Sequence, residues 1–148
     1  MPDQELIDGL IATYRELNSK VRSHPEDRLR IGDREGHSVR EVVSRLRDSE
    51  LRFSQALKER ITGVPIPDMF DESEAPVVGT ESADDSTNAL LSQFGTARES
   101  TLALLRTLPD ADWDADLEGG RPIRSRIEEL RDNDRRQVER IVGMLGAP

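Results

Sequence analysis

Hydrophobic residues recur every three or four positions in four separate segments of the chain, the spacing of one face of an α-helix. The first predicted helix runs from about Asp3 to Arg22. The proline after His24 ends it, because the residue before a proline is pushed out of helical geometry. The second follows Ser38, which opens a Ser-Val-Arg-Glu sequence typical of a capping box. Gly63 and the prolines behind it end this helix.

Two further segments complete a set of helices of similar length. The third predicted helix opens near Ser86 and closes at Leu108, before a proline, and the fourth starts at about Pro122. Each helix is about 20 residues, or roughly 30 Å, and carries one apolar stripe. The pattern therefore predicts an all-α fold, a four-helix bundle. Because 148 residues is a common size for one domain, we expect residues 1–148 to form a single domain.

The connections between the predicted helices differ in length. The segment 64–85, between the second and third helices, is acidic, contains three prolines and is long for a connection in a compact domain. We expect it either to cross the bundle as an overhand connection or to be partly mobile. The shorter loop 110–121 carries Trp113, the only tryptophan, which we expect to plug one end of the core.

Composition narrows the classes of partner. Hydrophobic and charged residues each make up 34% of the chain, but the apolar ones recur at helical spacing, which favours folding over disorder. With 30 acidic residues against 21 basic ones, the net charge of −9 repels nucleic acid and anionic membranes, so we expect neither as a partner. The absence of cysteine excludes disulfides and thiolate zinc sites. No signal-peptide pattern or long apolar run is visible, so we expect a cytoplasmic protein.

Three stretches of the sequence resemble the DinB-like, YfiT-like superfamily of four-helix bundles. They are residues 38–50 (SVREVVSRLRDSE), 97–113 (from ARE through LLRTLP to Trp113) and 130–141 (LRDNDRRQVERI). Together with an amphipathic first helix, the resemblance covers nearly the whole chain. It implies the same fold, and it implies pairing of two copies, since many such bundles form homodimers.

The resemblance also directs attention to three positions. Family members with a metal site take one histidine from the second helix and two, at i and i+4, from the fourth. The corresponding residues here are Arg45, Asn133 and Gln137. None is histidine, and a guanidinium repels a divalent cation from the same pocket. We therefore expect no metal and no cofactor at this site.

Two interpretations of Arg45, Asn133 and Gln137 are open. In the first, the two amides border the core and are satisfied by water or by Arg45. In the second, the three residues form a degenerate pocket that binds a small anion, such as a carboxylate, because a guanidinium offers a planar fork of donors. If Arg45 points into the bundle, its charge needs a partner, and Glu50 lies one turn further on.

Other polar residues suggest weaker candidates. Four acids of the second and fourth helices have arginine neighbours, so ion pairs on a solvated face are favoured over a cation site: Asp48, Glu50, Asp132 and Asp134. The alternating aspartates of 110–116 lack the glycine and glutamate of a calcium loop. We expect His24 and His37 to lie in solvent-facing loops, with His37 covering the start of the second helix.

The sequence leads to one main hypothesis and one alternative. The main hypothesis is a metal-free, non-catalytic DinB-like protein that acts as a small-ligand-binding or interaction module. The alternative is a diverged metal-dependent enzyme, thiol-S-transferase-like or hydrolase-like, with a rebuilt site. For the predicted homodimer, Leu91, Leu102 and Leu105 widen the apolar surface of the third helix, although a broad core-facing stripe explains them equally well.

Overall fold

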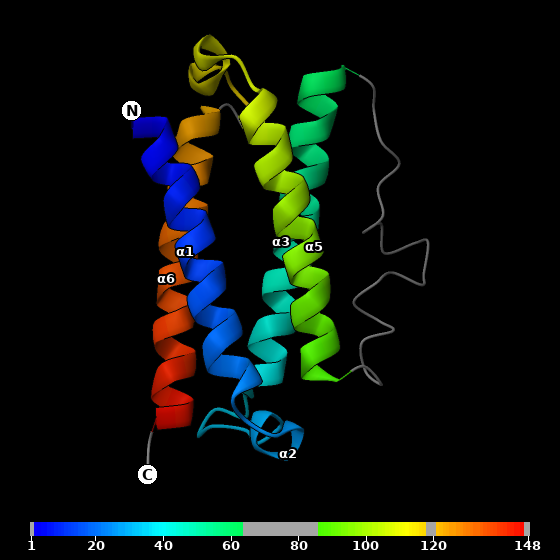
Figure 1. Cartoon of the computed structure of the whole chain (residues 1–148), viewed down its shortest axis with the longest axis vertical. Helices are drawn as coiled ribbons and strands as arrows, with labels where there is room; N and C mark the ends of the chain where they lie inside the picture. The colour runs from blue at the N-terminus through cyan, green and yellow to red at the C-terminus, as the bar shows by residue number, and fades with distance from the viewer. Residues whose placement is uncertain (1, 64–85, 118–120, 147–148) are drawn as a thin grey trace.

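The computed structural model describes residues 2–63, 86–117 and 121–146 and confirms the all-α, four-helix bundle (Figure 1). A short helix follows the first long one and a 3-10 turn precedes the last. The elements are α1 (Pro2–Arg22), α2 (Glu26–Leu29), α3 (Val39–Thr62), α5 (Thr87–Thr107), η1 (Asp110–Asp114) and α6 (Ile123–Gly146). The connection 64–85, for which we expected either an overhand crossing or partial mobility, lies outside the described residues.

The ends of the long helices follow the signals in the sequence. The Ser38 hydroxyl accepts a hydrogen bond from the backbone N–H of Glu41 at 3.1 Å, and the Ser86 hydroxyl caps α5 in the same way. Gly63 ends α3 in the left-handed region, with φ of 70°, and its N–H donates to the carbonyl of Glu59. A residue with a Cβ would be strained at that φ, which is why the helix stops at a glycine.

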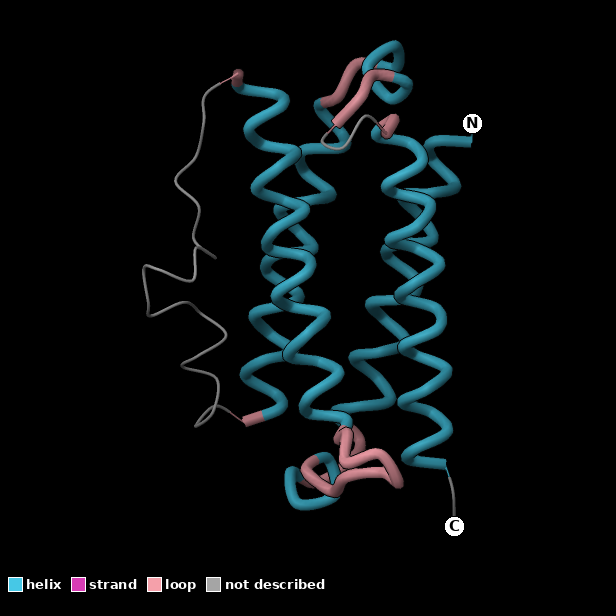
Figure 2. The backbone as a smooth tube through the Cα atoms, turned by 180° about the vertical axis from the view of Figure 1, so that it is seen from behind, coloured by secondary structure: helices cyan, strands magenta, loops and turns pink. Residues whose placement is uncertain are grey.

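The directions of the helices follow from which residues meet. Hydrogen bonds between α3 and α5 join residues 46 positions apart: Arg47 with Gln93, and Ser54 with Ser100. Those between α1 and α6 join residues 121 positions apart: Asp3 with Arg124, and Thr13 with Asp134. A constant separation means that the two helices of each pair run parallel. The pairs run opposite to each other, and α3 ends at the opposite end of the bundle from the start of α5 (Figure 1, and from behind in Figure 2).

The core consists of two apolar clusters, one toward each end of the bundle. The cluster at the α2 end includes Leu17, Val43, Leu90, Phe94 and Ile141. The cluster at the η1 end includes Leu10, Phe53, Leu102, Trp113 and Ile127. Trp113 is only 2% exposed within this second cluster, which confirms the prediction that it plugs one end of the core.

The extra leucines of α5 belong to the core of the chain itself. Leu91, Leu102 and Leu105 are each at most 2% exposed. They therefore do not provide a second apolar surface, and the broad core-facing stripe accounts for them. The homodimer remains a prediction that rests on the resemblance alone. Among the described residues, no helix is long and apolar enough to cross a membrane.

Candidate functional site

The three residues singled out by the sequence line one pocket between α3 and α6. Its volume is about 220 Å³. From α3 it is lined by Val42, Arg45, Leu46 and Ser49, and from α6 by Asn133, Gln137 and Arg140. The spacings of three and four residues within each set place them on one face of each helix. We call this cavity the α3–α6 pocket.

Arg45 lies at the rim of the pocket and does not point into the bundle. Its side chain is 62% exposed and donates to the carboxylate of Glu41, one turn earlier on α3, at 2.8 Å. The partner that we expected for an inward Arg45, Glu50, is instead bonded elsewhere. Gln137 donates its amide N–H to the Asn133 side-chain oxygen at 3.4 Å, so the two amides contact each other. Burying an ionised side chain costs free energy that an exposed one does not lose, which explains why Arg45 points outward.

Arg140 is a second guanidinium in the pocket that the sequence analysis missed. It follows Gln137 by three residues, so its position on the same face could have been found from helical spacing alone. Its Nη2 lies 2.7 Å from His37 Nδ1 and 3.6 Å from a carboxylate oxygen of Asp33. His37 thus lies beside the start of α3, as expected, and is in contact with α6.

The polar lining of the α3–α6 pocket favours anions and does not fit a divalent metal. It consists of two guanidiniums, two amides and the Ser49 hydroxyl, without an imidazole or a carboxylate. Divalent cations are held in proteins by imidazole, carboxylate and thiolate groups. In the described part of the chain, no group of three such residues is placed to hold a metal ion. Each guanidinium also has a carboxylate nearby, Glu41 at 2.8 Å from Arg45 and Asp33 at 3.6 Å from Arg140, so the pocket attracts an anion through directed N–H donors and not through an excess of positive charge.

A cluster of charged residues lies in the middle of the core, between the two apolar clusters. Arg98 on α5 donates from Nε and Nη2 to the two carboxylate oxygens of Glu50 on α3, both at 2.9 Å. Its Nη2 also donates to Asp134 Oδ2 on α6 at 2.5 Å, and its Nη1 to the Leu10 carbonyl on α1 at 2.8 Å. Thr13 on α1 is within 3.4 Å of the same oxygen of Asp134. This charge cluster therefore ties all four long helices together.

The charge cluster holds more negative than positive charge when all its groups are ionised. Burial lowers the pKa of Arg98, but Glu50 and Asp134 outweigh burial and raise it overall. Burial raises the pKa of Asp134, and Arg98 opposes that shift only in part. Asp134 Oδ1 is buried and makes no hydrogen bond within the described part of the chain. Arg98 and Glu50 therefore satisfy each other's hydrogen bonds, whereas Asp134 has one buried oxygen whose hydrogen bonding is not satisfied.

The prediction that the acids of α3 and α6 make ion pairs on a solvated face is wrong for two of the four. Glu50 is 1% exposed and Asp134 is 4% exposed. Asp48 and Asp132 do lie nearer the surface, each bonded to the arginine before it. Glu50 and Asp134 can be buried because Arg98, on the third helix α5, pairs with both of them. The residues next to each acid in the sequence do not indicate this distant partner.

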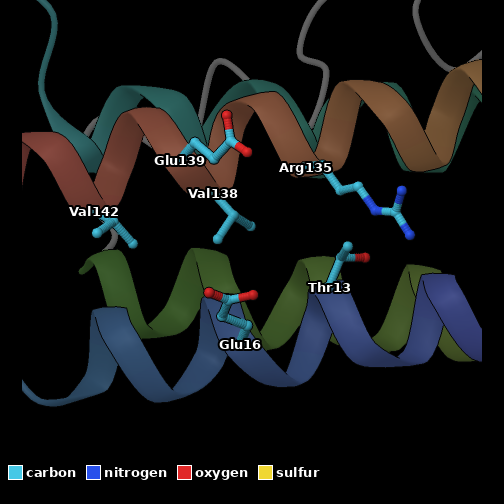
Figure 3. Close-up of a pocket in the computed structure, with 6 residues that line it drawn as sticks. All are labelled: Thr13, Glu16, Arg135, Val138, Glu139 and Val142. Atoms are coloured by element: carbon cyan, nitrogen blue, oxygen red, sulfur yellow. The ribbon is translucent and has the colours of Figure 1, made fainter.

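A larger groove of about 400 Å³ lies between α1 and α6 (Figure 3). Thr13 and Glu16 line it from α1, and Arg135, Val138, Glu139 and Val142 line it from α6. Its side chains carry both signs of charge and its valines form only a narrow apolar strip. This lining selects neither cations nor anions, so the α3–α6 pocket is the better candidate site.

Comparison with known proteins gives no relative for this chain: no protein-family model matches it, and neither does any curated protein or solved structure. The four-helix bundle stands on the structure itself. Function must therefore be argued from the site.

Proposed function

We propose that this chain is a non-catalytic module that binds a small organic anion in the α3–α6 pocket, on a DinB-like bundle that has lost the metal ligands of that superfamily. The observation that carries the proposal is the set of N–H donors in the pocket lining. Two arginines, Arg45 and Arg140, border it, and no acid does. Guanidiniums bind carboxylates and related oxyanions through paired N–H donors, so that ligand class fits best.

The size and the other lining groups narrow the ligand further. A volume of about 220 Å³ is below the usual 300–1,000 Å³ of pockets for drug-sized molecules, so the ligand has few heavy atoms. Val42 and Leu46 supply a small apolar wall, while Ser49 and the two amides supply neutral hydrogen-bonding groups. A short acid with one or two anionic ends, and a few carbons between them, matches this lining.

The DinB-like part of the proposal is supported by where three positions lie. Arg45, Asn133 and Gln137 were aligned to the family's metal ligands from sequence alone, and all three line the same pocket. The alternative is a metal-dependent enzyme with a rebuilt site, and it lacks such support because the pocket lining has no imidazole, carboxylate or thiolate to bind a metal. Elemental analysis of untagged protein tests this part: stoichiometric zinc, nickel, manganese or iron would overturn it.

Thermal unfolding with a panel of small anions tests anion binding. The panel includes succinate, inorganic phosphate and ethane disulfonate at matched ionic strength. A ligand present at ten times its Kd stabilises the native state by about 1.4 kcal/mol. For a chain of this size that raises Tm by about 3–5 °C. We expect at least one organic dianion to produce such a shift.

Two variants decide where the anion binds. Arg45→Met removes one cation from the pocket. Arg15→Met, on the exposed side of α1, removes the same charge elsewhere and is the matched control. We expect the first to abolish the ligand-induced shift and the second to keep it. No shift with any anion, or equal shifts in both variants, would refute the proposal.

A further inference from the structure

The loop between α2 and α3 is built around Asp33 and presents His37 to α6. Asp33 Oδ1 accepts hydrogen bonds from the backbone N–H groups of Glu35 and His37, both at 2.9 Å. The Asp33 N–H donates to the His37 carbonyl at 2.7 Å, which closes the loop, and Gly36 supplies the positive φ of 83°. The backbone N–H of His37 lowers the pKa of Asp33, which favours the ionised carboxylate that holds this loop.

The contact between His37 and Arg140 requires a neutral imidazole. A guanidinium has donors and no acceptor, so the short 2.7 Å approach of Arg140 Nη2 makes His37 Nδ1 the acceptor. Nδ1 then carries no proton. Adding one removes the acceptor and places a second positive charge beside the guanidinium. Protonation of His37 therefore breaks this contact.

The protonated form of His37 has its own partner in the same loop. A carboxylate oxygen of Glu35 lies 3.8 Å from Nδ1, close enough to pair with an imidazolium after a small rotation. The charged groups that face the ring are Arg140 from α6, and Asp33 and Glu35 from its own loop. Each protonation state of His37 thus has a partner: Arg140 for the neutral ring and Glu35 for the charged one.

We infer that His37 regulates the α3–α6 pocket: its neutral form occupies the Nη2 donor of Arg140, and its protonation frees that donor for the bound anion. This inference rests on the proposed anion-binding function. Arg140 lines the pocket, so the one donor in contact with His37 becomes available to the ligand when that contact breaks, while Asp33 stays 3.6 Å from the guanidinium. The imidazolium also adds positive charge beside the pocket. Both effects act in the same direction, and anion binding tightens as the pH falls.

The inference is tested by measuring affinity against pH with ethane disulfonate, which stays a dianion throughout. Titration calorimetry at about pH 5.5 and about pH 8 spans the range in which histidines change charge. We expect wild-type affinity to be about fivefold tighter at the lower pH, at the small end of measured couplings between sites. His37→Gln keeps an acceptor for Arg140 but cannot titrate, so its affinity should stay at the weaker value at both pH values.

His24→Gln is the matched control, because His24 and His37 are the only histidines of the chain. It should retain the full pH dependence of the wild type, whereas a general loss of acidic surface charge would affect all three proteins equally. Because coupling is reciprocal, saturating probe should also move the NMR titration midpoint of the His37 ring to higher pH and leave that of His24 in place.

The outcomes separate this inference from the proposed function. Binding that is equally tight at both pH values, or that varies in His37→Gln as it does in the wild type, overturns the regulation and leaves anion binding intact. No binding of any anion in the panel at either pH overturns both. Circular dichroism of the two histidine variants confirms that a lost pH dependence does not reflect an unfolded chain.

Discussion

The two buried carboxylates of the charge cluster should respond very differently to the loss of their charge. Arg98 makes two hydrogen bonds to Glu50 and one to Asp134. With one positive and two negative charges, the cluster carries a net charge of −1 when fully ionised. Glu50 is the counter-ion that Arg98 needs, and Asp134 is the excess. Glu50→Gln and Asp134→Asn test this difference, since each replaces a carboxylate by an amide of nearly the same shape.

The expected magnitudes follow from what each substitution leaves behind. Glu50→Gln weakens two of the hydrogen bonds of a fully buried guanidinium but leaves Asp134 as its counter-charge, so we expect a loss of about 2–3 kcal/mol, below that of a buried charge left unpaired. Asp134→Asn loses one charge-assisted hydrogen bond, worth about 1.5–3 kcal/mol. That loss is offset by removal of a buried charge whose penalty is of the same order. At pH 7 we therefore expect Asp134→Asn to lie within about 1 kcal/mol of the wild type.

The pH dependence gives a second test of the same reasoning. Burial raises the pKa of Asp134 above its ordinary value of 3.8, so the folded chain binds this proton more tightly than the unfolded chain does. The stability associated with this group is fully present below pH 3.8 and is lost as the pH rises through the folded pKa. Asparagine at this position does not titrate. Relative to the wild type, Asp134→Asn should therefore be less stable in acid and should gain as the pH rises.

Urea unfolding of the three proteins between about pH 4.5 and pH 7.5 measures both effects through the extrapolated free energy of unfolding. Titrations of groups distant from Asp134 are common to the wild type and Asp134→Asn and cancel in the difference; Glu50, whose charge acts on Asp134, is the exception, so the difference reports the pair of carboxyl groups. Two results would refute the argument. One is a loss in Asp134→Asn as large as that in Glu50→Gln at pH 7. The other is a difference from the wild type that stays constant over the whole range.

Two further predictions concern a close helix contact and the predicted site. A Cβ at Gly95 would overlap the Tyr14 hydroxyl and lie 2.9 Å from its Cζ, so Gly95→Ala should lower the free energy of unfolding by about 1–3 kcal/mol. Gly143 has open space around it, so Gly143→Ala should raise the free energy of unfolding by about 0.5–1 kcal/mol. Equal effects of the two substitutions in urea unfolding would contradict this. Histidine at all three predicted site positions should bind Zn²⁺ by calorimetry, and a folded variant that does not would count against the alignment to the DinB-like superfamily.

Local signals made most of the helix boundaries predictable. The caps at Ser38 and Ser86 and the stop at Gly63 depend on bonds within one turn of the chain, and such bonds leave a readable pattern. Burial of Trp113 followed from its size in a chain with few aromatic residues. The short helix α2 was missed because four residues are too few to show helical periodicity.

The candidate site was predictable in position and less so in detail. The resemblance placed three residues that line one pocket, but it did not give the outward direction of Arg45 or the presence of Arg140. The spacing of α6 was enough to place Arg140 on the pocket face, whereas its partners Asp33 and His37 lie in the loop before α3. His37 illustrates the difficulty, since it meets Arg140 across 103 positions of sequence. Contacts over such separations are set by the packing of whole helices, and they leave no local pattern.

The charge cluster did leave a signal, which becomes readable only when the four helices are compared. Near the middle of the bundle each apolar stripe contains a polar residue that belongs to the charge cluster: Leu10, Thr13 and Leu17 on α1; Leu46, Glu50 and Phe53 on α3; Phe94, Arg98 and Leu102 on α5; and Leu130, Asp134 and Val138 on α6. One interruption on its own indicates a polar residue at the edge of the core. Four at the same level of a bundle require mutual satisfaction, because a buried arginine without a counter-charge is not tolerated. Such a layer also fixes which helices pair at which height, since a shift of one turn would leave Arg98 facing Leu46 or Phe53 instead of Glu50.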